Sequence, residues 1–280
     1  MKSFSKVNFP VLRKAKKLYK SNKAQFETAM RNVIDNEDID VSERIYASAV
    51  ESMILYGYTN YYIETEDLGE FLSTTYVRKD AIPSISKYVK QNGKYFRSQG
   101  VTVYNSKDVP IEKSSGINFH ALSGCCYTKT FQKAIFFYIY DTGNFASLIV
   151  TDGDDYREVP LYGEIEGSKL RWAEDEFIEK IETLKSETKL ILNMIFYMDT
   201  FPEKISNEPP NEVSDKLNKD KSLTIKQAEQ ITEYLREVSP HLRRGYFKCL
   251  TSEYFTPEKR GSTIFVKATF VKGKGTVIKE

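Results

Sequence analysis

The densest group of chemically capable side chains in this sequence lies directly after Pro240. An imidazole and two guanidinium groups come first, and two aromatic rings and an ammonium group follow within the same eight residues. Guanidinium groups bind phosphates and carboxylates through paired hydrogen bonds, and exposed aromatic rings stack on nucleic-acid bases. The segment therefore predicts a binding site for an anionic group. Its members are His241, Arg243, Arg244, Tyr246, Phe247 and Lys248.

Two other interpretations of this segment stay open. Histidine and arginine together can cleave RNA without a metal ion, so the group would also suit a ribonuclease, with His241 as its one histidine. Alternatively, the imidazole and the arginines satisfy carbonyl and carboxylate groups where a helix meets a hairpin, and they bind no ligand.

Elsewhere the sequence offers little for catalysis. His120 lies close to Cys125 and Cys126, which would suit a thiol nucleophile and its base, but a buried cysteine is usually an inert apolar residue. The acidic residues 152–155 fit a hairpin turn better than a calcium loop, because the bidentate glutamate of such a loop is missing. There is no glycine-rich phosphate loop and no HExxH, GxSxG or CxxC motif. We expect no metal and no cofactor.

The chain on either side of this segment is predicted to form a helix, a charged turn and a hairpin. Pro240 ends the preceding helix, because proline has no N–H donor and disfavours helix in its predecessor. Strands are expected at 246–250 and 263–271, with a polar segment between them. The second strand alternates, with Ile264, Val266 and Ala268 on one face and Phe265, Lys267 and Thr269 on the other.

A resemblance to a known family rests on this part of the chain. The run Pro240-His241-x-Arg243-Arg244-Gly245 and two aromatic residues, closed by Phe265-Val266 and Phe270-Val271, resembles the C-terminal signature of a family from phages, plasmids and integrative elements. Residues 192–198 are similar to a leucine-rich segment of the same family. The commoner signature has a second histidine and a tryptophan where this chain has Tyr246 and Phe247, so any role of that histidine is lost here.

The family includes a type V-A anti-CRISPR protein that suppresses production of the CRISPR effector nuclease by recognising its nascent N-terminal peptide. The resemblance implies a non-enzymatic recognition protein from a mobile element, with Arg243 and Arg244 at or beside the contact with a host defence protein, the type V-A effector. One alternative is an RNA-binding protein or metal-independent ribonuclease that uses His241, Arg243 and Arg244. Another is a structural or regulatory phage protein whose signature is only architectural.

Composition sets further bounds. The chain has 280 residues, enough to bury a core without disulfides or metal ions, and its three cysteines include an adjacent pair, which rarely forms a bridge. This cysteine usage suits a reducing cytoplasm. The longest apolar runs, 134–140 and 190–198, are too short to span a bilayer, and no apolar segment of a signal peptide follows the basic N-terminus. We expect a protein of the host-cell cytoplasm with no membrane contact.

The net charge of +2 conceals an asymmetry along the chain. Residues 1–23 carry eight Lys or Arg and no acidic residue, and residues 236–280 carry ten against four. The body between them carries 23 against 35. Two basic ends on an acidic body suit RNA, a ribosome or an acidic protein as partner, or they are simply solvated helix faces and termini.

Periodicity predicts an α+β fold: a helical N-terminal part, a central antiparallel β-meander with a long core helix, and a C-terminal helix plus β-hairpin. Four tyrosines around Gly57, namely Tyr56, Tyr58, Tyr61 and Tyr62, are expected to pack in the core or on a sheet. Helices are expected at 11–34, 42–56, 82–91, 174–199 and 223–238, and Thr224 with Gln227 forms a capping box for the last. Strands are expected at 100–104, 134–140, 145–151 and 156–162, with turns at 141–144 and 152–155.

The same patterns divide the chain into units. Residues 1–95 are expected to form a helical region, and residues 96–200 an antiparallel sheet with the long helix. Residues 201–222 are polar and contain three prolines, which predicts a linker. Residues 223–280 are expected to form a helix-hairpin module that carries the signature.

Overall fold

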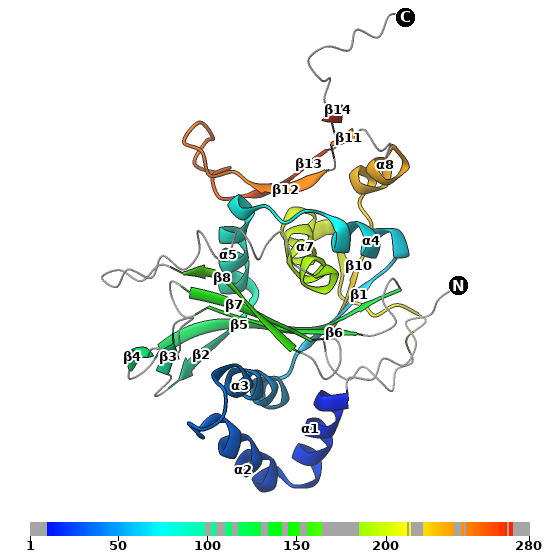
Figure 1. Ribbon diagram of the computed structural model, residues 1–280. Coiled ribbons are helices and arrows are strands. Elements are labelled where there is room, and N and C mark those ends of the chain that lie inside the picture. Colours follow the sequence, from blue (N-terminus) through cyan, green and yellow to red (C-terminus); the bar gives the residue numbers. More distant parts are fainter. Residues whose placement is uncertain are drawn as a thin grey trace, which may run out of the picture.

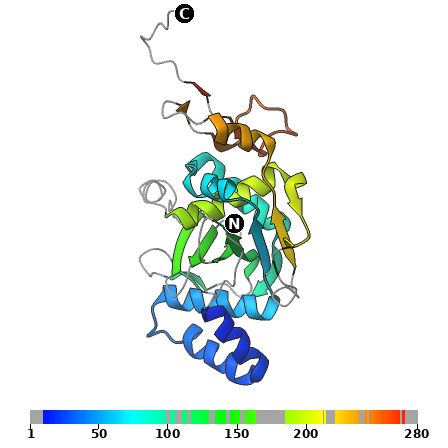
Figure 2. The ribbon, with the colours of Figure 1, turned by 90° about the vertical axis from the view of Figure 1, so that its right-hand side faces the viewer.

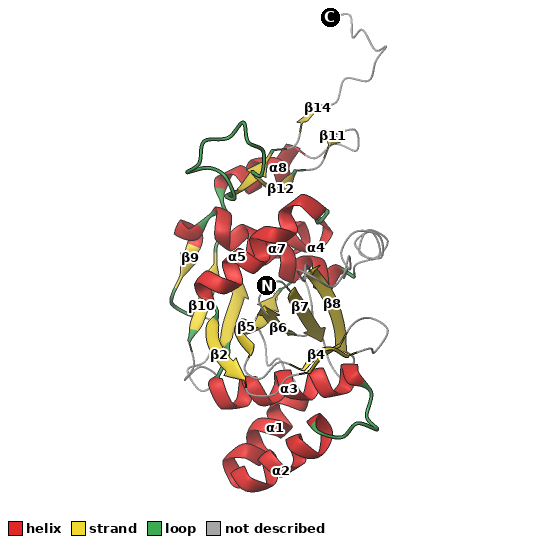
Figure 3. Ribbon diagram, turned by 90° about the vertical axis from the view of Figure 1, so that its left-hand side faces the viewer, coloured by secondary structure: helices red, strands yellow, loops and turns green. Residues whose placement is uncertain are grey.

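Four layers are stacked in the computed structural model, which confirms the α+β class (Figure 1). A group of N-terminal helices covers one face of a mixed sheet, a second group of helices covers the other face, and a hairpin lies over that second group. The two side views show the same stacking (Figures 2 and 3). The structure describes residues 10–98, 102–104, 110–113, 117–129, 134–141, 145–151, 156–163, 185–211, 213, 221–237, 242–243, 245–267 and 269–270.

The N-terminal layer consists of α1 (Pro10–Ser21), α2 (Lys23–Ile34) and α3 (Val41–Tyr56). The prediction of one continuous helix over 11–34 is wrong, because Asn22 has an extended backbone between α1 and α2. Its side chain accepts a hydrogen bond from the backbone N–H of Gln25, which satisfies a free donor at the start of α2. Leu12 and Met53 bring α1 and α3 into an apolar cluster with the underside of the sheet.

The central sheet has the strand order β8-β7-β6-β5-β1-β10-β9 among the described residues, and β2 also pairs with β5. The meander β6-β7-β8 is antiparallel, as predicted, and β5 adds to it antiparallel to β6, whereas β1 is parallel to both β5 and β10. The expected turns between these strands lie outside the described residues. The strands are β1 (Thr59–Ile63), β2 (Lys94–Ser98), β5 (Ile117–Thr128), β6 (Ile135–Asp141), β7 (Phe145–Thr151), β8 (Tyr156–Gly163), β9 (Ile205–Ser206) and β10 (Ser222–Ile225), with β3 (Thr102–Tyr104) and β4 (Pro110–Lys113) paired separately.

The longest strand, β5, was not predicted. It lies in the middle of the sheet, and polar and apolar residues alternate only over its first half, 117–121, because most residues of its second half are buried on both faces. Its first half pairs with β2 and its second half with β1. The prediction for the tyrosine cluster is confirmed for β1, where Tyr61 and Tyr62 are buried.

The second helical layer contains α4 (Glu66–Thr74), α5 (Ile82–Asn92) and α7 (Ser186–Thr200), with the short turn η1 (Lys79–Ala81) before α5. Pro83 lies in the first turn of α5, as predicted. Residues 190–198 of α7 are all buried, which confirms this segment as a central core element. The helix begins at Ser186, because Lys185 is extended, so the prediction of a continuous helix over 174–199 is wrong. The acidic residues before it lie outside the described part of the chain.

One buried polar side chain joins two of these helices. Asn193 of α7 has no exposed surface, and its amide nitrogen donates to the backbone carbonyls of Leu72 at 2.8 Å and Thr75 at 3.0 Å. Both carbonyls lie at the C-terminal end of α4, where a helix leaves acceptors without partners. Asn193 therefore supplies donors that α4 cannot provide for itself.

The segment predicted as a linker, residues 201–222, belongs to the folded structure at both of its ends. Phe201 is buried, η2 (Pro202–Lys204) and β9 follow it, and β9 is antiparallel to β10. The predicted helix start at 223 is wrong, because Leu223 and its neighbours form β10 beside β1. Thr224 is a strand residue whose hydroxyl donates to the carbonyl of Glu208 at 2.5 Å, not a helix cap. The helix, α8, spans Glu229–Glu237.

The C-terminal strands form the predicted hairpin. β12 (Tyr246–Cys249) is antiparallel to β13 (Thr263–Val266), and β11 (Leu242–Arg243) is antiparallel to β14 (Thr269–Phe270). The hairpin contacts α7, α5 and η1 (Figure 1). Across the described ranges, every helix is too short or too polar to cross a membrane.

The donor role of Asn193 can be tested by replacement with an isosteric acceptor. In Asn193→Asp, a buried carboxylate faces two carbonyls, and we expect a loss of about 3–5 kcal/mol in the free energy of unfolding at pH 7. The loss should shrink as the pH falls and the carboxyl group gains a proton. Urea unfolding followed by circular dichroism measures both values. Met194→Leu, an adjacent substitution of similar volume, should cost less than about 1.5 kcal/mol. Equal losses for the two variants would contradict the assigned role.

Candidate functional site

The structure divides the predicted site residues between described and undescribed parts of the chain. His241 and Arg244 lie outside the described residues, so their predicted roles stay predictions. Arg243 is described by its backbone in β11, opposite Thr269. Tyr246 and Lys248 lie on β12 with Phe247 between them, and side chains of a strand alternate between its faces. The predicted cluster is therefore split by the strand itself.

The inner face of the hairpin belongs to the core. Phe247 is 1% exposed, and its ring lies 6.0 Å from Phe196 of α7, 6.4 Å from Phe71 of α4 and 5.4 Å from Phe265 of β13, between centroids. Cys249 is buried on the same face. The expectation that Phe247 stacks on a ligand is wrong, because its ring is enclosed by other rings of the core.

Gly245 of the signature has a packing role. A β-carbon at this position would lie 2.5 Å from the ring of Phe265 and 3.1 Å from the carbonyl oxygen of Val266. Either contact is shorter than normal side-chain packing allows, so the chain needs glycine here for the ring to fit. This part of the signature is architectural.

The outer face of the hairpin carries the other residues. Tyr246 is opposite Val266 and Lys248 is opposite Ile264, so these four side chains share one face. Ile264 is 38% exposed, whereas Phe265 is buried. The predicted alternation is present over Thr263–Val266, with Phe265 on the face that packs on the core, but the prediction of one strand over 263–271 is wrong, because β13 ends at Val266 and Lys267 lies outside it.

A loop closes the far end of this outer face into a groove. The groove has a volume of about 540 Å³ and is lined by Tyr246, Lys248, Leu250, Phe255, Lys259, Ser262, Ile264 and Val266. Arg260 fixes the loop by donating to the carbonyls of Glu253 at 3.1 Å and Phe255 at 3.4 Å. Gly261 completes the turn with a φ of +79°, a backbone conformation that glycine adopts without strain. We call this cavity the hairpin groove.

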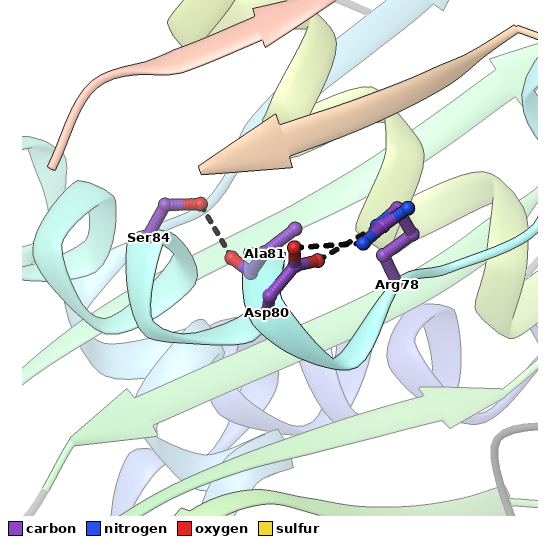
Figure 4. Close-up of polar contacts among 4 residues, drawn as sticks. All are labelled: Arg78, Asp80, Ala81 and Ser84. Atoms are coloured by element: carbon purple, nitrogen blue, oxygen red, sulfur yellow. Dashed lines mark hydrogen bonds and ion pairs between the residues drawn. The ribbon is translucent and has the colours of Figure 1, made fainter. Parts of the chain in front are cut away.

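An arginine from a distant part of the sequence supports one end of the hairpin groove. The guanidinium carbon of Arg78 lies 4.5 Å from the ring centroid of Tyr246, and two nitrogens of the group donate to Asp80, each at 2.9 Å (Figure 4). The bidentate geometry fixes the plane of the guanidinium group over the ring. Hydrogen bonding to Asp80 raises the pKa of Arg78. No pattern in the sequence joins Arg78 to a tyrosine so far along the chain.

Two lysines give the hairpin groove a positive lining. Lys248 and Lys259 line it together with apolar side chains, and no acidic residue does. Beside the hairpin, Lys87 of α5 donates to the carbonyl of Gly261 at 3.1 Å and so ties the loop to the helical layer. An apolar floor with cations suits a ligand that has both apolar and acidic groups.

The proposed thiol–imidazole pair does not form. His120 and Cys125 lie on opposite faces of β5, because they are five positions apart on a strand, an odd number. Cys126 shares the face of His120 but lies six residues away, roughly 20 Å along the strand. Burial raises the pKa of Cys125 to about 12 and raises that of Cys126 further, which disfavours the thiolate at neutral pH. Cys249 is also buried.

Metal chemistry has no support in the described residues, which contain no group of three or more His, Cys, Asp or Glu side chains that could hold an ion. The acidic cluster at 152–155 lies outside them. No family model matches the chain, and no curated protein or solved structure is significantly similar to it. The functional argument therefore rests on the hairpin and its surroundings.

The opposite roles of neighbouring residues on β12 predict opposite effects of truncation. Phe247→Ala empties a buried aromatic site and should lower the free energy of unfolding by about 3–5 kcal/mol. Tyr246→Ala removes a partly exposed ring and its contact with Arg78, which should cost about 1 kcal/mol. Denaturant unfolding of the two variants measures both values. A larger loss for Tyr246→Ala would show that the faces are assigned the wrong way round.

The burial of the thiols predicts their reactivity. At pH 8 the native protein should react with iodoacetamide at least 100-fold more slowly than the unfolded protein, because the thiolate is the reacting species. Mass spectrometry of labelled cysteines against time gives the two rates. Fast native labelling of Cys125 or Cys126 would contradict the buried, protonated state and restore a thiol nucleophile as a hypothesis.

Proposed function

We propose that this chain is a non-enzymatic recognition protein that binds an extended polypeptide in the hairpin groove. The observation that carries the proposal is that the two faces of the hairpin have different environments. The face of Phe247 and Phe265 is fixed in the core, while the face of Tyr246, Lys248 and Ile264 is left toward solvent as a groove. A rigid scaffold that presents a shaped apolar and cationic surface is suited to binding.

The backbone of the hairpin supports an extended ligand. Within the described residues, β12 and β13 form a two-stranded sheet, so each has one edge that pairs with no further described strand. A polypeptide strand that adds to such an edge gains main-chain hydrogen bonds, and alternate side chains point to one face. On this hairpin that face contains the groove.

The lining defines the sequence that the ligand needs. Ile264, Val266 and Leu250 favour apolar side chains, while Lys248 and Lys259 favour carboxylates. An extended segment that alternates apolar and acidic residues matches both requirements. Aromatic rings such as Tyr246 contribute large contact areas at such surfaces with little loss of conformational freedom.

The resemblance of the C-terminal signature supplies a candidate partner. It points to a phage or plasmid anti-CRISPR protein that acts in the host cytoplasm by binding the type V-A CRISPR effector as a nascent chain. The signature places Arg243 and Arg244 beside the hairpin in sequence, where they would extend the cationic lining of the groove. The partner in this proposal is thus the N-terminal segment of that effector.

A direct binding measurement tests the proposal. Fluorescence anisotropy with a labelled peptide from the effector N-terminus should give saturable binding to the wild-type chain. Ile264→Asp places a charge on the groove floor and should weaken binding by about 30-fold, because hot-spot changes cost about 2 kcal/mol. Lys248→Glu should weaken binding to a segment that contains acidic residues.

Matched controls separate this proposal from its alternatives. Lys226→Glu makes the same charge change on an exposed residue outside the groove and should leave binding unchanged. Equal affinities of wild type and Ile264→Asp for the peptide would overturn the site. RNA cleavage by the wild-type chain that disappears in His241→Ala would instead establish the ribonuclease alternative.

A further inference from the structure

The N-terminal helix α1 lies on the side of the molecule opposite the hairpin, and its exposed face is cationic (Figure 1). Its exposed residues lie within one arc of the helix, because they recur at three-, four- and seven-residue intervals. No acidic residue occurs in α1. The exposed residues are Arg13, Lys14, Lys17, Lys20 and Ser21.

The other side of α1 is occupied by packing. Leu12 is 3% exposed in the cluster under the sheet, and the ring of Tyr19 meets that of Phe26 edge-on at 5.5 Å. Lys16, at the border of the two sides, lies 5.4 Å from the ring centroid of Tyr58. A helix that lies in a membrane surface must insert its apolar side, and here that side packs against the protein through Leu12 and Tyr19. The surface is therefore purely electrostatic.

The charge pattern opposes the stability of the helix. Like charges at i, i+3 and i, i+4 spacings repel, and Arg13 lies in the first turn, where the helix dipole favours an anion. None of the exposed lysines Lys14, Lys17 and Lys20 forms a salt bridge with a described residue. An external polyanion would relieve this repulsion along the whole arc.

We propose that the exposed arc of α1 binds the phosphodiester backbone of a nucleic acid, as a second site that goes beyond the peptide-binding groove. Residues 13 to 20 extend over about 10 Å of helix, and long lysine side chains reach further, so several consecutive phosphates fit. The one aromatic ring of α1, Tyr19, is packed edge-on against Phe26, so the exposed arc itself carries no ring on which a base could stack. The proposed contact therefore recognises the charged phosphates of the backbone and does not depend on the base sequence.

The position of α1 makes this site independent of the first. The central sheet and the second helical layer separate the arc from the hairpin groove (Figures 1 and 3). A polypeptide on one side and a nucleic acid on the other side therefore do not compete for the same surface. If the experiments show that one of the two sites binds nothing, the proposal for the other site can still be tested.

The test is a titration of the full-length chain against a fluorescent 20-nucleotide poly(U) RNA and a DNA strand of equal length, at several salt concentrations. The triple variant Lys14→Gln, Lys17→Gln, Lys20→Gln keeps good helix formers at each position. Loss of three phosphate contacts should lower the affinity about 100-fold at 0.1 M salt and reduce the slope of log K against log salt by about 2. If the triple variant loses affinity for both RNA and DNA, the result supports recognition of the phosphodiester backbone. If it loses affinity for only one of the two, that nucleic acid is the ligand of the site.

The control is a second triple variant, Lys185→Gln, Lys221→Gln, Lys226→Gln, which removes three exposed lysines from other elements. It should retain wild-type affinity and slope. Equal losses for the two triple variants would overturn the proposal, because the binding would then follow net charge alone. Absence of wild-type binding, or α1-dependent binding to phosphatidylserine vesicles without binding to nucleic acid, would also overturn it.

Discussion

The burial of α7 on all sides is the constraint on which the rest of the structure depends. An apolar helix needs cover around its whole circumference, and no single sheet provides it. The sheet lies below, α4 and α5 lie beside it, and the hairpin lies above (Figure 1). Within this packing Asn193 is the polar connection, because it satisfies carbonyls of α4 that would otherwise lie buried without donors.

The hairpin takes its functional character from this role as a cover. Its inner residues, Phe247 and Phe265, complete an aromatic cluster with Phe71 and Phe196, and that packing fixes the orientation of the two strands. A two-stranded hairpin has no second layer above it, so its outer face stays open. The stacking of Arg78 on Tyr246 then ties this outer face to the segment that leads into α5. The packing of the inner face thus holds the outer face, the proposed binding surface, in a fixed position.

The proposed polypeptide and nucleic-acid sites share one physical principle. Each lies on an element whose apolar side is consumed by the core and whose remaining side chains serve no packing purpose. On the hairpin these are Ile264 and Lys248, which combine apolar area with charge, and on α1 they are mainly cations, Arg13 and three lysines. This difference in composition is the reason why we propose different partners for the two surfaces.

The sequence by itself determined the fold class, the meander β6-β7-β8, the helix α5, the apolar core segment 190–198 and the C-terminal hairpin, because each has a clear period or breaker residue. It could not determine β5, whose second half lacks alternation because residues on both of its faces are buried, or the break at Asn22, which a capping hydrogen bond decides. The signature residues were recognised, but only tertiary packing decided which face of β12 turns inward. Phe247 entered the core, and Arg78, distant in sequence, joined Tyr246 at the surface, because contacts between remote segments have no trace in local spacing.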